Sequence, residues 1–449
     1  MIPALAGLAA GLAGIGAAQA LAASRLVASF ARKPAKAAAE RPPVTVLKPL
    51  YGDEPLLEAA LATLCEQDYP VWQIVFGVQS EADPAIATVR RLQSRFPAAD
   101  IALTIDPTLH GANRKVGNLI NMFPAARHDT IVIADSDVHV RPDYLDRLVA
   151  ALESPGVGLV TTLYAGLPAG TIPAPNPGAP NPGPSPGYRR NETSGRPPSS
   201  PAITGSKSTT PAPRPPGLPA RLGATQITHG FLPGAVLARA FGRQDCLGAT
   251  MCLRRRDLER IGGLAALVDH LADDNVLGRR IAALGMRVAL AQTVPLTTVP
   301  EPTLSALFRH ELRWARTIRA LEPAGFAASV LQYPLFWALL AIPLAGAAPW
   351  SIGLFMIAWV LRATAALGVD AALLPLWTRE RGSNDDAALA FSCPVWLLPL
   401  RDIFSVAVML ASYGGRQVDW RGHGLHADTP PPFTRQTNTL RPIQGNKTR

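Results

Sequence analysis

The chain has 449 residues, a formal net charge of +10 and 48% hydrophobic residues. This length exceeds that of one small domain, and a mean hydropathy of +0.14 is high for a protein without membrane segments. The sequence contains no zinc-finger spacing, P-loop, Gly-x-Ser-x-Gly elbow or His-Glu-x-x-His motif. We therefore expect no nucleic-acid partner, and we attribute the positive charge to a membrane surface or a phosphate-bearing substrate.

The first apolar segment covers residues 2–24 and contains no charged side chain. Basic residues follow it at Arg25, Arg32, Lys33, Lys36 and Arg41. The segment is long enough to cross a bilayer, and its basic flank predicts that the following chain lies in the cytoplasm. The alternative is a cleaved signal peptide, because small residues recur at 18–23, but no positive charge precedes the apolar run. We predict a transmembrane anchor over residues 1–25.

Residues 44–165 alternate short apolar runs with helical patterns. Strands are predicted at 44–47, 72–78, 101–105 and 130–134, and helices at 56–66, 85–96 and 116–123. This alternation is typical of an α/β fold, a mostly parallel sheet with helices on both faces. Ligands of such sheets bind beyond the carboxyl ends of the strands.

Asp135 and Asp137 directly follow the apolar strand predicted at 130–134. Two carboxylates at a strand end suit a divalent cation, Mn²⁺ or Mg²⁺, that bridges the protein to the diphosphate of a nucleotide sugar. An ordinary polar turn after a strand is the alternative. Lys115, at a predicted loop-to-helix junction, could contact phosphate or sugar, or it could face solvent.

Two later motifs contain further candidates. Asp273 and Asp274 begin a helical pattern, where acids either favour the helix N-terminus or act as a general base toward an attacking hydroxyl. Arg313 suits a diphosphate and Trp314 the wall of a sugar or acceptor site. The segment around them, 310–319, also fits a basic amphipathic helix that lies on lipid head groups.

Cysteine and histidine give no metal signal in the sequence. The four cysteines form no CxxC pair, which is typical of a reducing compartment. His229, Cys246 and Cys252 lack metal-ligand spacing, and we interpret them as structural. The segment 168–220 is dense in Pro, Gly, Ser and Thr, so it cannot bury a core and is predicted to be a disordered insert.

Three more apolar stretches lie at 326–349, 351–375 and 389–413. Arg362 and the pair Arg401-Asp402 fall inside them, and such groups must face protein, water or head groups. The basic tail favours a cytoplasmic end, whereas three full crossings from the cytoplasm would place it outside. One stretch therefore either does not span the membrane or counts twice.

The order of the acidic motifs resembles a known signature. The residues concerned are Asp83, Asp135, Asp137, Asp274 and His310-x-x-Arg313-Trp314. They resemble the D, D, D, (Q/R)xxRW signature of family 2-like glycosyltransferases that act on lipids or elongate polysaccharides. The segments 46–52, 68–70, 78–79, 83–86, 115–119, 248–255 and 262–264 look like those of ceramide glucosyltransferases (family 21) and of bacterial relatives associated with hopanoid biosynthesis. The likeness covers residues 44–320.

This resemblance implies a GT-A nucleotide-sugar transferase fold and an inverting, metal-dependent transfer. It also implies one role for each matching residue: nucleoside contact for Asp83, donor contact for Lys115, metal and diphosphate binding for Asp135 with Asp137, the general base for Asp274, and pyrophosphate binding and acceptor-site shape for Arg313 and Trp314. His310 departs from the family pattern, which has Gln or Arg there. The insert at 168–220 is a second departure.

We therefore predict transfer of a hexose, glucose or N-acetylglucosamine, from a UDP-sugar to the hydroxyl of a membrane lipid, ceramide or a hopanoid. The expected location is a bacterial inner membrane, crossed several times, with the catalytic domain in the cytoplasm. A processive polysaccharide synthase and a non-catalytic membrane scaffold are the alternatives. The predicted segments are an anchor (1–25), a nucleotide-sugar-binding part (42–167), the insert (168–220), an acceptor and catalytic part (221–322), membrane segments (326–413) and a basic tail (414–449).

Overall fold

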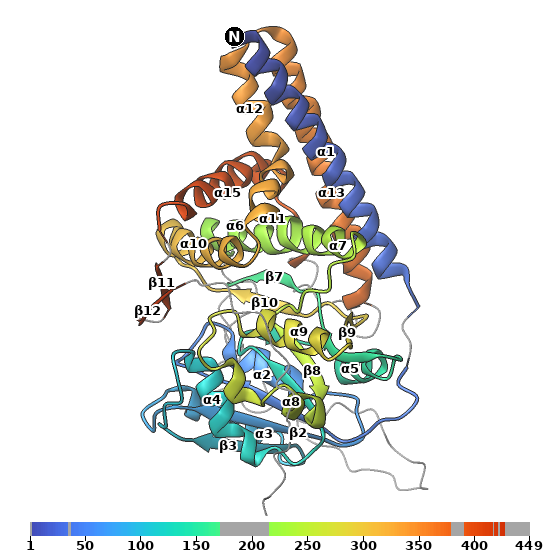
Figure 1. Ribbon diagram of the computed structural model, residues 1–449, viewed down its shortest axis with the longest axis vertical. Coiled ribbons are helices and arrows are strands. Elements are labelled where there is room, and N and C mark those ends of the chain that lie inside the picture. The colour runs from blue at the N-terminus through green and yellow to red at the C-terminus, as the bar shows by residue number, and fades with distance from the viewer. Residues whose placement is uncertain are drawn as a thin grey trace, which may run out of the picture.

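The computed structural model describes residues 2–34, 37–170, 215–378, 390–415, 417–420 and 423–426. A globular α/β part lies at one end of the long axis and a bundle of apolar helices at the other (Figure 1). Most of the predicted insert, 171–214, and most of the predicted tail lie outside the described residues. Within the described part, β7 ends at Pro168 and α6 begins at Leu218, so residues 218–220 belong to a helix rather than to the insert.

The globular part is built on a seven-stranded sheet with the order β3-β2-β1-β4-β8-β6-β9. Its strands are β1 (Val44–Pro49), β2 (Trp72–Val78), β3 (Asp100–Ile105), β4 (Thr130–Ala134), β6 (Val157–Thr161), β8 (Thr250–Arg254) and β9 (Arg287–Leu290). All neighbours pair in parallel except β8, which is antiparallel to both β4 and β6. The predicted α/β fold with a mostly parallel sheet is therefore confirmed.

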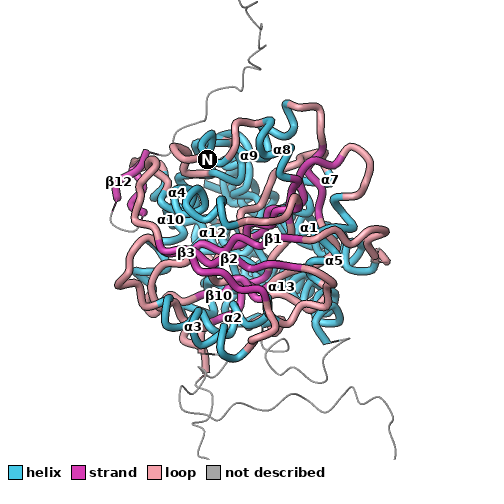
Figure 2. Tube along the Cα trace, turned by 90° about the horizontal axis from the view of Figure 1, so that it is seen from below, coloured by secondary structure: helices cyan, strands magenta, loops and turns pink. Residues whose placement is uncertain are grey.

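Helices cover both faces of this sheet (Figure 2). One core packs α2 (Leu57–Cys65), α3 (Ala85–Arg95) and α5 (Tyr144–Leu152) against the sheet. The core on the opposite face contains α4 (Arg114–Met122), α8 (Arg255–Arg260) and α9 (Asp273–Ala283). Because both faces are buried, the central strands read as continuous apolar runs, which is why their sequence pattern was informative.

A layer of helices lies across the base of the apolar bundle (Figure 1). It contains α6 (Leu218–Gln226), the π-helix η2 (Ile227–Phe231), α7 (Leu232–Ala240), α10 (Leu304–Leu321) and α15 (Leu398–Ser412). A three-stranded sheet connects this layer to the globular part and consists of β5 (Val138–His139), β10 (Leu296–Val299) and β7 (Ala165–Pro168). The remaining short elements are η1 (Phe123–Ala125), η3 (Leu264–Leu267), η5 (Val395–Leu397), β11 (Gln417–Trp420) and β12 (His423–His426).

Three helices form the bundle along the long axis: α1 (Ile2–Arg32), α12 (Pro334–Leu344) and α13 (Pro349–Thr378). The N-terminal end of α1 and the turn between α12 and α13 lie together at the tip (Figure 1). By length and composition, Ile2–Arg32, Pro349–Thr378 and Val395–Ser412 could each cross a membrane. α1 packs against α12 and α13 along the bundle.

Two of the predicted C-terminal stretches differ from straight spans. The stretch at 326–349 is bent by 67° between Pro323–Gln332 and Pro334–Leu344, where α11 (Pro323–Ala328) and η4 (Ser329–Gln332) lead into α12. Pro334 sits at the start of the second segment, and proline disfavours a continuous helix through such a junction. The last stretch forms α15, which runs beside α10 across the base of the bundle rather than along it (Figure 1).

Candidate active site

Parallel strands bring several polar loops to one edge of the large sheet. β1 lies between β2 and β4 and runs parallel to both, so the loops that follow these three strands meet at their carboxyl ends. Asp83, after β2, accepts hydrogen bonds from the backbone N–H of Gly52 at 3.0 and 3.2 Å. Asp83 thereby ties together the loops that follow β1 and β2.

Asp135 follows β4 at this edge and pairs with a lysine from α4. The Nζ atom of Lys115 lies 2.7 Å from Oδ1 of Asp135 and 3.5 Å from Oδ2 of Asp273. Burial opposes the charge of Lys115, but the neighbouring carboxylates, Asp135 first, outweigh it and raise its pKa. Asn113 caps α4 by accepting the N–H of Val116 at 3.1 Å, which fixes the start of the helix that carries Lys115.

Asp137 lies two residues further on, in a more enclosed environment. Its Oδ2 atom accepts a hydrogen bond of 2.6 Å from the hydroxyl of Thr297. Burial, with the charge of Asp135 as a second cause, raises the pKa of Asp137 to about 6. An acid whose charge is disfavoured in this way gains from any cation that arrives beside it.

Lys48, on β1, is a fully buried cation next to these acids. Its Nζ atom donates to the backbone carbonyl of Val138 at 3.0 Å. Burial lowers the pKa of Lys48 to about 8, while the charges of Asp137, Asp135 and Glu54 partly offset this effect. The side chain therefore lies within electrostatic reach of both members of the Asp135–Asp137 pair.

Asp274 lies in the first turn of α9 and accepts the backbone N–H of Asn275 at 2.7 Å. Burial and the adjacent Asp273 raise the pKa of Asp274 to about 7, although Lys115 acts in the opposite direction. Gly248 faces the carboxylate closely, since a Cβ atom at this position would lie 2.9 Å from Oδ2 of Asp274. The absence of a side chain at Gly248 thus leaves the room that Asp274 occupies.

Helix α10 brings Trp314 to the same region. Trp314 packs against a small core of Ala220, Ala224, Ile227 and Val299, to which the ring of Tyr164 also belongs. Burial and the charges of Asp274, Asp135 and Asp137 together raise the pKa of Tyr164. Tyr164 therefore connects the tryptophan with the three carboxylates.

Two neighbours of Trp314 on α10 are also partly buried. The ring of His310 packs edge-on against Trp314 with 4.4 Å between the ring centres, and its Nδ1 atom bonds to Glu301. Arg313 is half-buried on the same helix, one residue before Trp314. His310, which departs from the family pattern, thus orients the tryptophan through its ring.

The structure brings Lys115, Asp135, Asp137 and Asp274 within electrostatic reach of one another. Asp83 bonds to the loop that follows β1, and the roles of all these residues stay predictions. Sequence reasoning missed Lys48 and Tyr164 as parts of the site and gave Asp273 no role separate from that of Asp274. A lysine inside an otherwise apolar strand was the available signal for Lys48. Nothing in the local sequence marks Tyr164, because its neighbours come from distant segments.

The acidic residues fit a divalent cation. Asp135 and Asp137 offer oxygen ligands, which Mg²⁺ and Mn²⁺ prefer, and the side chain of Asp135 is 38% exposed and so accessible from solvent. Burial first, and the charge of Asp135 second, raise the pKa of Asp137, and a metal ion beside the two acids would favour their charged forms. The donor set and its excess negative charge therefore agree with the predicted metal.

A separate polar network lies where the membrane helices meet the globular part. The two terminal guanidinium nitrogens of Arg401 donate to the carboxylate of Glu311 at 2.8 and 2.7 Å, and this pair is buried. Arg401 also donates to the carbonyl of Leu222 at 3.2 Å and to the hydroxyl of Ser405. The charge of Arg401 in this predicted membrane stretch is thus satisfied by α10, with α6 accepting a further hydrogen bond, whereas Asp402 accepts the backbone N–H of Leu335 in α12 at 3.1 Å.

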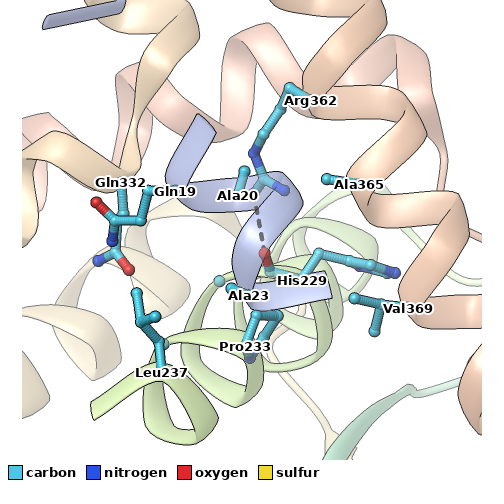
Figure 3. A pocket seen from close by; sticks show the side chains of 12 residues that line it. Gln19, Ala20, Ala23, His229, Pro233, Leu237, Gln332, Arg362, Ala365 and Val369 are labelled. Carbon is cyan, nitrogen blue, oxygen red and sulfur yellow. Dashed lines mark hydrogen bonds between the residues drawn. The ribbon is translucent and has the colours of Figure 1, made fainter. Parts of the chain in front are cut away.

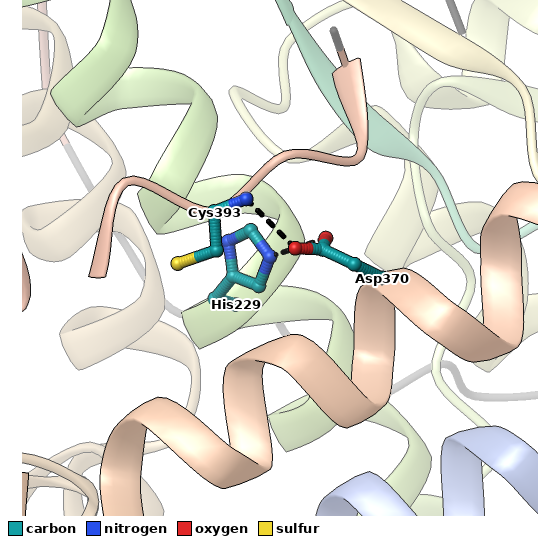
Figure 4. Close-up of side chains that lie close together, drawn as sticks. All are labelled: His229, Asp370 and Cys393. Atoms are coloured by element: carbon teal, nitrogen blue, oxygen red, sulfur yellow. Dashed lines mark hydrogen bonds and ion pairs between the residues drawn. The ribbon is translucent and has the colours of Figure 1, made fainter. Parts of the chain in front are cut away.

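Arg362 and Asp370 of α13 bond to the π-helix. Arg362 donates to the carbonyl oxygen of His229 at 3.0 Å and lines a pocket between α1, α13 and α7 (Figure 3). Asp370 binds the His229 ring at 2.7 Å and accepts the N–H of Cys393 at 2.7 Å (Figure 4).

The potential ligand atoms of His229, Asp370 and Cys393 lie within 4.8 Å of one another. This nitrogen, sulfur and oxygen set suits zinc better than Mg²⁺ or Mn²⁺, so it differs in kind from the Asp135–Asp137 pair. Spacing could not reveal the cluster, because Asp370 lies 141 residues from His229 and 23 from Cys393.

One protein-family comparison covers most of the chain. The model of glycosyl transferase family 21 matches residues 9–175 and 207–431. Together with the observed sheet, this match confirms the GT-A fold that the motifs implied. The gap in the match, 176–206, falls inside the predicted insert.

Curated relatives match over a shorter region. Ceramide glucosyltransferase of Komagataella phaffii is 36% identical over 113 residues, which are 24% of this chain and 22% of that protein. Ceramide glucosyltransferase 1 of Caenorhabditis elegans is 32% identical over 102 residues, 23% of this chain and 22% of that protein. The matched region thus spans less than a quarter of these relatives' length.

Among solved structures, the mannosyltransferase PcManGT of Pyrobaculum calidifontis, in complex with GDP-Man and Mn²⁺, aligns with 91% of this chain and 99% of its own. Its sequence identity is 19% and the TM-score is 0.47.

Proposed function

Because this chain belongs to glycosyltransferase family 21, we propose that it transfers a hexose, glucose or N-acetylglucosamine, from a UDP-sugar to the hydroxyl of a membrane lipid. The observation that carries the proposal is the grouping of Asp135, Asp137 and Asp274 around Lys115 and Tyr164, beside a helix layer at the base of an apolar bundle. A water-soluble donor and a lipid acceptor can meet at this place without the lipid leaving the bilayer. Such proximity replaces an improbable bimolecular encounter.

In this proposal the donor binds at the carboxyl ends of the strands. Asp83 contacts the nucleoside, and Arg313 and Lys115 meet the diphosphate. Asp135 and Asp137 would hold Mn²⁺ or Mg²⁺, which when bound neutralises the charge of the departing diphosphate. Lys115 also keeps Asp135 in place through its 2.7 Å ion pair.

Asp274 serves as the general base. Its pKa of about 7 leaves a substantial fraction ionised at neutral pH, while the carboxylate remains basic enough to take the proton of the acceptor hydroxyl. Asp273 is less suited to this role, because it is buried and held by Lys115 at 3.5 Å and by the amide of Asn113 at 3.5 Å. The ring of Trp314 would form one side of the acceptor site.

We also propose a membrane topology. α1, the α11–α12 segment and α13 cross the membrane, with the N-terminus and the α12–α13 turn on the far side. α15 then lies at the interface, because it runs across the base of the bundle. This arrangement returns the chain to the catalytic side after α13 and removes the conflict with the basic tail. The basic residues after α1 favour a cytoplasmic catalytic domain, and a bacterial inner membrane is the proposed location.

The identity of the donor and the acceptor is tested with the purified protein in lipid nanodiscs, in a buffer that contains Mn²⁺. UDP-glucose, UDP-N-acetylglucosamine and other UDP-sugars are offered with ceramide in one arm and a hopanoid alcohol in the other, and UDP release and the lipid product are measured. We test ceramide first because the curated relatives carry that name. Addition of a single sugar supports the proposal, whereas a growing polymer would favour a processive synthase.

The matched variants are Asp274→Asn and Asp129→Asn. Asp129 has a side chain that is 97% exposed and lies outside the site, so its variant controls for loss of one carboxylate. We expect Asp274→Asn to lower turnover by about 10²–10⁴-fold with donor binding kept. Absence of UDP release with every donor and both lipids, or full turnover in Asp274→Asn, would contradict the proposed reaction.

A further inference from the structure

A second pocket lies on the side of the molecule away from the carboxylates. Its volume is about 530 Å³, and its walls come from the end of α1, from α7 with the loop after it, and from β9 with the loop after it. β9 is an edge strand of the large sheet, separated from β4 by β8 and β6. The pocket therefore lies apart from the proposed site of sugar transfer.

The charged residues that line this pocket are all basic: Lys33, Arg239, Arg243 and Arg287. Arg243 is neutralised, because it pairs with Asp245 at 2.7 Å and with Glu322 at 3.0 Å. No described carboxylate forms an ion pair with any of the other three. The guanidinium of Arg239 donates to the backbone carbonyl of Val288 and that of Arg287 to the carbonyl of Pro155, and neither contact cancels charge.

Apolar side chains also line the pocket, and they come from helices at the base of the apolar bundle. Leu26 and Phe30 come from the last turns of α1, and Val236 comes from α7, which lies across the base of the bundle. Phe241, just after α7, is 82% exposed. An exposed aromatic ring beside basic side chains is typical of a surface that rests at the boundary between head groups and acyl chains.

We propose that this pocket binds the phosphate-bearing head group of an anionic glycerophospholipid. The phosphate lies among Lys33, Arg239 and Arg287, and the acyl chains leave along Leu26 and Phe30. Three cations that form no ion pair with any described carboxylate favour a net negative head group over a zwitterionic one. The apolar side chains favour a lipid over free phosphate.

A lipid bound here would connect α1 to β9 and so fasten the membrane anchor to the catalytic domain. The chain already joins these parts directly, since the amide of Gln292 donates to the carbonyl of Phe30. This inference concerns a site other than that of sugar transfer, so its failure would leave the proposed reaction untouched.

The test uses the full-length protein in neutral detergent, titrated with phosphatidylglycerol, with phosphatidylcholine or with inorganic phosphate. Bound lipid is counted by native mass spectrometry, and thermal unfolding is followed in parallel. We expect phosphatidylglycerol to bind and to raise the unfolding temperature, because a ligand that binds only the folded state stabilises it. Phosphatidylcholine and inorganic phosphate should do so much less.

The double variant Arg239→Gln/Arg287→Gln should bind phosphatidylglycerol roughly 30-fold more weakly, and Arg239→Lys/Arg287→Lys should retain most of the affinity. The control Arg90→Gln/Arg256→Gln removes two exposed cations from α3 and α8, in the part of the molecule away from the bundle, and should bind as the wild type does. The readout is the lipid-dependent difference within each variant, so a general loss of stability does not mimic the effect. Equal binding of the two phospholipids, an equal response to inorganic phosphate, or unchanged binding in the Gln double variant would overturn the proposal.

Discussion

The acids near the sheet edge and the acids near the membrane helices differ in how their charge is balanced. Around Asp135, Asp137 and Asp274, carboxylates outnumber the nearby lysines, and two of them have pKa values raised to about 6 and 7. At the base of the bundle, Glu311 is matched by Arg401 through two short bonds. Burial also raises the pKa of Glu311, so the two groups differ in the number of cations beside the acids and not in the direction of the pKa shift. We therefore expect a cationic ligand at the sheet edge, where cations are too few, and none at the Glu311–Arg401 pair.

Besides the loss already expected for Asp274→Asn, the largest effect is expected where the unbalanced group meets its proposed metal. Asp135→Asn replaces one carboxylate oxygen by an amide nitrogen and removes the negative charge that pairs with Lys115 at 2.7 Å. We expect turnover to fall by about 10²–10³-fold, because metal-ion stabilisation of developing charge contributes several kcal/mol. Turnover should be measured together with Mn²⁺ affinity by titration, and unchanged Mn²⁺ affinity would argue against a metal at Asp135.

Substitutions in the Glu311–Arg401 pair should change the stability of the protein rather than its turnover. Glu311→Gln leaves Arg401 buried without its counter-charge and should destabilise the protein by about 3–5 kcal/mol. The double variant Glu311→Met/Arg401→Met should recover much of that loss, since a well-packed apolar pair costs little where an ion pair stood. Thermal unfolding in detergent provides the measurement. A double variant that is as unstable as the single one would indicate that Arg401 acts through Leu222 or Ser405 instead.

A smaller effect is expected at Gly248, which borders the unbalanced group without carrying charge. Gly248→Ala would place a Cβ atom 2.9 Å from Oδ2 of Asp274, so the carboxylate must move by a few tenths of an ångström. We expect about a tenfold loss of turnover, since misplacement of a general base is costly. The control is Gly353→Ala, because a Cβ atom at this position on α13 meets open space, and its turnover should equal that of the wild type. A glycine with a positive φ, such as Gly242 at 91°, would be strained by alanine and is not suitable.

The smallest effect concerns pH. The pKa of Asp274 is raised to about 7 from 3.8, so the folded protein binds more protons than the unfolded chain between about pH 4 and pH 7. The contribution of this group to stability is therefore complete below about pH 4 and is lost as the pH rises through about 7. Without metal, Asp274→Asn should be more stable than the wild type at pH 8, by about 1–2 kcal/mol, and this advantage should shrink at pH 5. The free energy of unfolding of both proteins is measured by denaturant titration at each pH. A difference between variant and wild type that is the same at pH 5 and pH 8 would show that the pKa of Asp274 is not raised in the folded protein.

Much of the fold could be predicted from local patterns. β2 and β4 coincide with the predicted strands at 72–78 and 130–134, because each is a buried run in a sheet covered on both faces. Asp135 and Asp137 could be found for a related reason: they directly follow such a strand. A feature that consists of one strand and the loop directly after it can be predicted from the local sequence alone.

Features built by distant segments could not be predicted. Arg401 looked anomalous inside a membrane stretch, and its partner Glu311 lies 90 residues away in a helix that was assigned other roles. The direction of α15 is set by its packing on α10 and α12, which no periodicity within 389–413 encodes. The 67° bend before α12 could be predicted only in part. Pro334 in the sequence indicates a break in the helix, but the angle depends on the helices packed around it.

The packing of α1 joins segments that lie far apart in the sequence. α12 and α13, against which α1 packs, follow it by about 300 residues. The contact is close, because a Cβ atom at Gly16 would lie 2.2 Å from the carbonyl oxygen of Leu331. This surface of α1 is therefore covered only by segments that come late in the chain. We expect a chain cut before α12 to leave the Gly16 surface exposed and α1 without its main packing partners.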